Sequence, residues 1–135
     1  MKRLLALALL SFAAITMADP AMVYFISPAN NAVVSNPVTL QFGLKGMGIA
    51  PAGSESTNPA HKTGHHHLLI DTPLPTDMTL PIAMDEKHRH FGGGQTETSL
   101  QLTPGKHTLQ LLQADKNHIP HVPAVYSPVL TIIVK

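Results

Sequence analysis

Short apolar runs, several of them alternating with polar residues, follow one another between prolines and glycines along most of the chain. In the segment 38–44, Val38, Leu40 and Phe42 occupy every second position, which is the period of a half-buried β-strand. The same pattern predicts strands at 21–26, 38–44, 65–71, 96–102, 106–113 and 129–134, with shorter ones at 33–34 and 80–84. Beyond residue 18, no stretch has the pattern of an amphipathic helix.

This succession of about seven short strands predicts an all-β domain, specifically an immunoglobulin-like Greek-key β-sandwich. Twelve prolines and nine glycines supply the turns between the strands. In such a sandwich, alternate loops gather at one end of the molecule. We therefore expect the loops at 43–64, 86–95 and 114–123 to meet at a shared rim.

The first 18 residues differ from the rest and predict a signal peptide. A basic start at Lys2 and Arg3 precedes an apolar run, and small residues end at Ala18, after which we expect cleavage. The run is shorter than the roughly 20 apolar residues that span a bilayer, although an uncleaved anchor is the alternative. The expected product is a single domain of residues 19–135, periplasmic or secreted, with no membrane span after cleavage.

The charge of this product is close to neutral. Without Lys2 and Arg3, seven of the nine basic residues remain against eight acidic ones, a formal charge of −1. No basic patch is evident, so nucleic acid is not an expected partner. The chain has no cysteine, so disulfides do not stabilise it and thiolates do not bind metal in it.

The distribution of histidines indicates a possible metal-binding site. All but one of the nine histidines fall into three clusters, at 61–67, 88–90 and 118–121, each in or beside one of the converging loops. Imidazole binds transition metals such as copper and zinc and titrates near neutral pH. The candidate metal ligands are His65, His67, His88, His90, His118 and His121.

The spacing within the clusters supports chelation. His65 and His67 stand two positions apart on a predicted strand, so their side chains point to the same face, and His66 points to the other. His88 and His90 have the same spacing on a predicted loop. The alternative is that these histidines are solvated polar residues beside glycine-rich loops.

Two other features are interpreted structurally. His107 starts a predicted strand at the end opposite the rim, in line with Leu109 and Leu111, and we expect it to take a structural role in the core. The glycines at 92–94 match no phosphate-binding motif. They predict a turn that lets the backbone approach a neighbour closely, with His90 as the candidate.

Four strings, taken together, carry a family resemblance: GHHHLLID at 64–71, HFGGGQTE at 90–97, PGKHTL at 104–109 and DKNH at 115–118. Their order resembles the DUF4399 family of small exported bacterial domains of unassigned function. The resemblance extends over nearly all of the chain after the signal peptide. It implies a compact β-rich periplasmic domain and brings no established activity with it.

Three functions remain open from the residues alone. The first is a periplasmic metal-binding module that stores, delivers or senses copper or zinc. The second is a non-catalytic structural or interaction domain of the cell envelope, with another envelope protein as partner. The third is a metal-dependent enzyme with an open coordination position, for which Asp71 or Glu97 would act as general base.

Overall fold

The computed structural model describes residues 19–54, 56 and 62–135. The predicted signal peptide, residues 1–18, and the predicted cluster member His61 lie outside the described residues. All regular secondary structure in the described part of the chain is β-strand, as the alternating pattern predicts. Within that part, no helix is long and apolar enough to cross a membrane.

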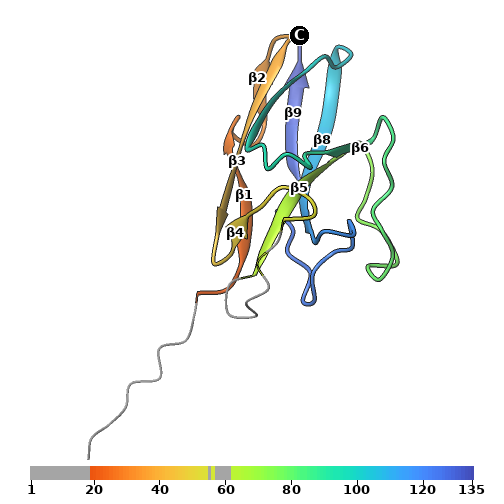
Figure 1. Ribbon diagram of the computed structural model, residues 1–135. Coiled ribbons are helices and arrows are strands. Elements are labelled where there is room, and N and C mark those ends of the chain that lie inside the picture. The colour runs from red at the N-terminus through yellow and green to blue at the C-terminus, as the bar shows by residue number, and fades with distance from the viewer. Residues whose placement is uncertain (1–18, 55, 57–61) are drawn as a thin grey trace, which may run out of the picture.

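Among the described residues, nine strands form two sheets. Figure 1 shows β9, β8 and β5 side by side in the larger sheet. The first sheet has the antiparallel order β1-β3-β7, from β1 (Met22–Ser27), β3 (Val38–Lys45) and β7 (Glu97–Leu100). The second has the order β2-β9-β8-β5-β4, from β2 (Ala32–Val34), β9 (Leu130–Val134), β8 (Gly105–Ala114), β5 (Thr63–Ile70) and β4 (Gly48–Ile49). A further short strand, β6 (His88–His90), also pairs with β5.

The main hydrophobic core contains residues of both sheets. Its fully buried members include Leu40 on β3, Leu68 on β5 and Leu111 on β8. Because side chains alternate along a strand, the next residues on β5 and β8 point to the opposite face of their sheet. There Leu69 and Leu112 form a second, smaller cluster with Ile82, which belongs to the segment between β5 and β6. Both faces of β5 are therefore buried, and its outer face is covered by connecting segments.

The connecting segments explain where the predicted secondary structure was wrong. No strand forms at 80–84. This segment contains Pro81, which has no N–H to donate to a ladder, and the N–H of Ile82 donates to the carbonyl of His118 instead. The predicted 43–64 loop contains β4, and His88 and His90 lie on β6 rather than on a loop.

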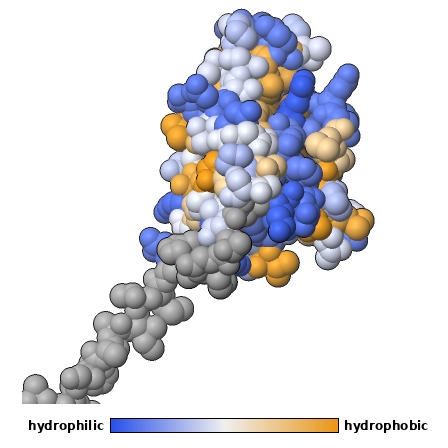
Figure 2. Space-filling view, viewed as in Figure 1, coloured by the Kyte–Doolittle hydropathy of each residue, from blue (hydrophilic) through white to orange (hydrophobic). Residues whose placement is uncertain are grey.

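The surface has a mixed character. Several large apolar side chains are more than half exposed, among them Ile26, Leu80, Met84 and Val122. On the face shown in Figure 2, hydrophobic side chains occur in separate small groups among hydrophilic ones. His65 and His67 lie beneath this surface, fully buried on the outer face of β5.

Candidate metal centre

β5 supplies the first two histidines of the centre. His65 and His67 share the outer face of the strand, and both are fully buried. Their Nε2 atoms lie 3.0 Å apart. The intervening His66 points to the inner face, where its ring packs 5.2 Å from that of Phe42 and its Nδ1 contacts Gln113 Nε2. Alternation along the strand thus separates one core histidine from a pair that faces the same point.

β6 supplies the third histidine through its register with β5. His90 is paired with His67 across the antiparallel ladder, and their ring centres are 5.0 Å apart. Directly paired residues on neighbouring antiparallel strands project to the same side of the sheet. A side chain at Gly92 would collide with the ring of His90. The prediction that the glycine turn allows a close approach to His90 is therefore confirmed for Gly92.

The fourth histidine comes from a tight turn that follows β8. The Asp115 carboxylate accepts hydrogen bonds from the backbone N–H of Asn117, at 2.8 Å, and of Ile119, at 3.1 Å. The Asp115 carbonyl accepts a third from the N–H of His118, at 2.9 Å. This arrangement holds His118 at a φ of 63°, a left-handed conformation that non-glycine residues seldom adopt. The turn directs the imidazole of His118 back over β5.

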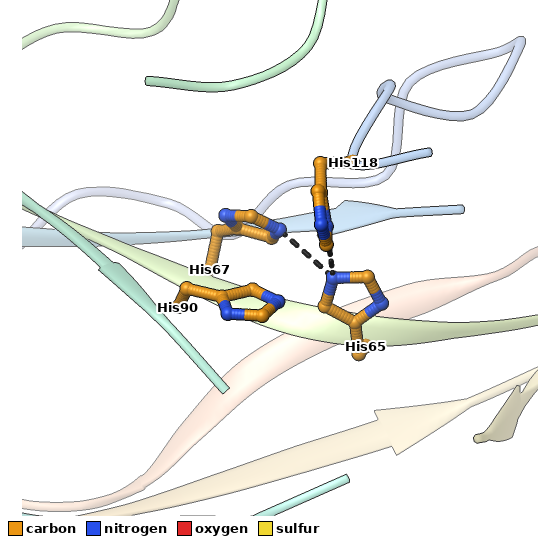
Figure 3. A group of neighbouring side chains, drawn as sticks. All are labelled: His65, His67, His90 and His118. Atoms are coloured by element: carbon orange, nitrogen blue, oxygen red, sulfur yellow. Dashed lines mark hydrogen bonds between the residues drawn. The ribbon is translucent and has the colours of Figure 1, made fainter. Parts of the chain in front are cut away.

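The four imidazoles meet at one point, and their rings face one another in Figure 3. One nitrogen from each of His65, His67, His90 and His118 lies within 4.8 Å of the others. Each of the three histidine clusters thus contributes at least one member. No carboxylate among the residues that the structure describes belongs to this group. Among these described residues, the group offers four nitrogen ligands and no carboxylate ligand.

The four imidazoles cannot satisfy all of their close nitrogen–nitrogen contacts with hydrogen bonds. His65 Nε2 faces two other ring nitrogens, His67 Nε2 at 3.0 Å and His118 Nδ1 at 3.1 Å. A neutral imidazole nitrogen carries one hydrogen or one in-plane lone pair, so it makes one good hydrogen bond and not two. A cation at the centre would instead accept a lone pair from every ring. The contacts therefore suit a metal ion better than they suit a closed hydrogen-bond network.

The protonation states fit the same conclusion. Burial, reinforced by the neighbouring His90 and His118, lowers the pKa of His65 to about 4, although Asp115 acts in the opposite direction. Burial and His65 lower the pKa of His67 to about 3, and burial also lowers the pKa of His90. Neutral imidazole is the form that binds metal. At neutral pH these rings need not lose a proton in order to bind.

Two of the predicted ligands lie outside the group of four. The His88 ring uses Nδ1 to contact the Asp85 carboxylate at 2.8 Å, which anchors the start of β6. His121 lies against the backbone of Gly64, where an added Cβ would come within 2.6 Å of its Nε2. It is close enough to lower the pKa of His65. Neither residue offers a nitrogen to the same set of mutually close atoms.

His107 has the structural role that its position predicts. It is mostly buried at the far end of β8. Its Nδ1 contacts the Asp71 carboxylate at 2.7 Å, and its Nε2 contacts the Thr103 carbonyl at 2.8 Å. These partners suit an imidazolium that donates through both nitrogens, and they raise the pKa of His107 against the effect of burial. Asp71 is thereby engaged with His107 and does not belong to the group of four histidines.

Sequence reasoning missed the part played by Asp115. The residue carries no metal-ligand signature, and its effect depends on the turn that it stabilises. The available signal was turn chemistry, because an Asp in a loop often accepts a hydrogen bond from the backbone N–H two positions on. Its carboxylate is also the negative charge that acts on His65.

Comparison with known proteins gives a family and nothing closer. The model of the DUF4399 family, described as a domain of unknown function, matches residues 40–135. The chain belongs to the DUF4399 family. No curated protein and no solved structure matches it. The matched region contains all four histidines of the group. Because the family is described as having no known function, the function must be argued from the site itself.

Proposed function

We propose that this DUF4399 domain is an exported metal-binding module that holds one zinc or copper ion through His65, His67, His90 and His118. The observation that carries the proposal is the meeting of four imidazole nitrogens within 4.8 Å of one another. Neutral imidazole is a favoured ligand of both metals. The periplasm is the proposed location, supported by the predicted signal peptide.

The number of protein ligands supports a role in holding an ion rather than in catalysis. Catalytic zinc sites have three protein ligands and an open position for water, whereas four protein ligands close a structural or storage site. Two of these ligands, His65 and His67, are fully buried. Asp71, proposed from the sequence as a general base, contacts His107 instead, and Glu97 is exposed on β7 of the other sheet. Storage, delivery or sensing of a metal is therefore the role that we propose.

The finer fold assignment belongs to the same proposal. We retain the immunoglobulin-like Greek-key sandwich as the architecture of the module. The supporting feature is the strand order, in which β1, β3 and β7 form one sheet while β9, β8 and β5 are adjacent in the other. These correspond to strands A, B and E and to G, F and C of such a sandwich.

Calorimetric titration of the purified protein with zinc and with copper tests the function. We expect binding tighter than about 10 μM with one ion per chain. His65→Ala and His90→Ala should each weaken it by at least about tenfold. The matched controls are His88→Ala and His121→Ala, which remove predicted ligands outside the group of four and should leave one-to-one binding in place. Equal loss in all four variants, or none in any, contradicts the assignment.

A second candidate is a non-catalytic structural or interaction domain of the cell envelope. It is favoured by the contact of 3.1 Å between His65 Nε2 and His118 Nδ1, which would then serve as a hydrogen bond that ties the His118 turn to β5. On this hypothesis a chelator leaves the melting temperature of the purified protein unchanged, while His65→Ala lowers it without added metal. Metal-dependent stabilisation of the wild type separates the two candidates.

A further inference from the structure

The four imidazole rings are not only close together. Their arrangement also limits the coordination geometry that a bound ion can adopt. Six distances join the centres of four rings. For His65, His67, His90 and His118 they are 4.9, 4.9, 5.1, 5.0, 5.8 and 4.6 Å. All six are similar, and four points with six similar separations form a tetrahedron rather than a plane.

The expected separations for a bound ion can be calculated. With metal–nitrogen bonds of about 2.0–2.1 Å, each ring centre lies roughly 3.2 Å from the ion, and a tetrahedron separates the ring centres by about 5.2 Å. A square-planar shell with the same bonds requires four separations of about 4.5 Å and two diagonals of about 6.4 Å. The observed values cluster around the tetrahedral figure.

No choice of diagonals produces a square. In a square, the two diagonals join opposite pairs that share no ring. The pairing with the largest distances combines His65–His90 at 4.9 Å with His67–His118 at 5.8 Å. Both are well below a diagonal of about 6.4 Å. A square-planar ion would therefore have to push two opposite pairs of rings apart.

The backbone opposes that movement. His65 and His67 are fixed by the pleat of β5, and His90 by its ladder with β5 and by the backbone of Gly92 behind its ring. His118 is held by the three hydrogen bonds of the Asp115 turn. Flattening the shell would require β6 or this turn to move away from β5. The placement of the four rings is thus set by three separate elements of the fold before any ion binds.

We propose that the centre binds its ion tetrahedrally, a geometry that suits zinc and reduces the usual preference for copper(II), and this inference rests on the metal-binding function proposed above. Copper(II) prefers a tetragonal shell and, where the ligands are free to adapt, binds more tightly than zinc. Zinc has no such geometric preference and accepts a tetrahedron. Copper(I) accepts a tetrahedron as well, but it is selected by sulfur ligands, and the four ligands here are all imidazoles.

Cobalt(II) and copper(II) report the geometry directly. We expect the cobalt-loaded wild-type protein to show the intense visible absorption of tetrahedral cobalt, and the copper-loaded protein to give the electron paramagnetic resonance spectrum of a distorted, non-tetragonal site. In competition titrations, the preference for copper(II) over zinc should be at least about tenfold smaller in the wild type than in His118→Ala. That variant leaves three histidines and open positions, so copper(II) can adopt its preferred shell.

The outcomes separate this inference from the function on which it rests. Failure of the wild type to bind any of the three ions overturns the metal-binding function. Binding with faint octahedral cobalt bands and a regular tetragonal copper spectrum leaves that function standing and overturns the tetrahedral centre. If His118→Ala does not fold, the spectra of the wild-type protein alone decide the matter.

Discussion

Acid should destabilise the metal-free protein by charging three histidines of β5. The pKa values of His65, His66 and His67 are lowered to about 4, about 4 and about 3, with burial as the main cause in each case. In the unfolded chain each has a pKa of about 6.5. Between pH 6.5 and 4, the unfolded chain therefore binds more protons than the folded protein. The free energy of unfolding must fall as the pH falls through this window.

The size of the effect follows from the pKa of the unfolded chain. Each histidine that stays neutral in the fold costs about 1.4 kcal/mol for every pH unit below 6.5. At pH 5 this is about 2 kcal/mol per residue, or about 6 kcal/mol for His65, His66 and His67 together. Domains of this size are stable by roughly 5–15 kcal/mol, so much of the stability is lost. His107, whose pKa is raised, opposes the loss only near the top of this window, because near pH 5 it is charged in both states and no longer changes the slope.

Urea denaturation of chelator-treated protein, followed by far-ultraviolet circular dichroism, measures this dependence. The chain has no tryptophan and two tyrosines, which makes circular dichroism the better probe. The slope of stability against pH should correspond to at least about three protons near pH 5, because burial also lowers the pKa of His90. In the double variant His65→Gln/His67→Gln it should fall by about two protons. As a control, His107→Gln should change the stability but not this slope. A free energy of unfolding that is the same at pH 7 and pH 5 would refute the reasoning.

Four further predictions concern the centre, its supports and His107. Zinc at about 100 times its dissociation constant should stabilise the protein by about 2.7 kcal/mol in the same assay, and a variant that cannot bind it should show no change. In calorimetric titration, Asp115→Ala should weaken zinc binding by about tenfold or more. Asp115→Asn keeps the side-chain acceptor of the turn and should have the smaller effect. The reverse order would show that the charge of Asp115 contributes more to binding than the hydrogen bonds of the turn. Gly92→Ala should displace the His90 ring and weaken binding, and unchanged affinity would mean that His90 is not a ligand. His107→Gln should be most destabilising at acid pH. A group with a raised pKa stabilises the fold below its unfolded pKa, and this stabilisation is lost as the pH rises through the folded pKa. A loss of unfolding free energy that is independent of pH would count against the ion pair with Asp71.

Local pattern alone was sufficient for the strands and for part of the centre. Alternation of apolar and polar residues is a short-range property, so the segments that became β3, β5 and β8 could be predicted from their own residues. The same alternation placed His65 and His67 on one face and His66 on the other. It also misled at 80–84, where the backbone partner of Ile82 is the distant His118 and not a strand.

Tertiary structure decided which histidines meet. The sequence does not distinguish His88 from His90 as a ligand. The register of β6 pairs His90 with His67, whereas it pairs His88 with Leu69, two residues further along β5. His118, rather than His121, is directed inward by a turn whose shape depends on the Asp115 carboxylate. Register and turn geometry arise from contacts between segments far apart in the chain. Spacing along the sequence cannot encode the distances that these contacts set.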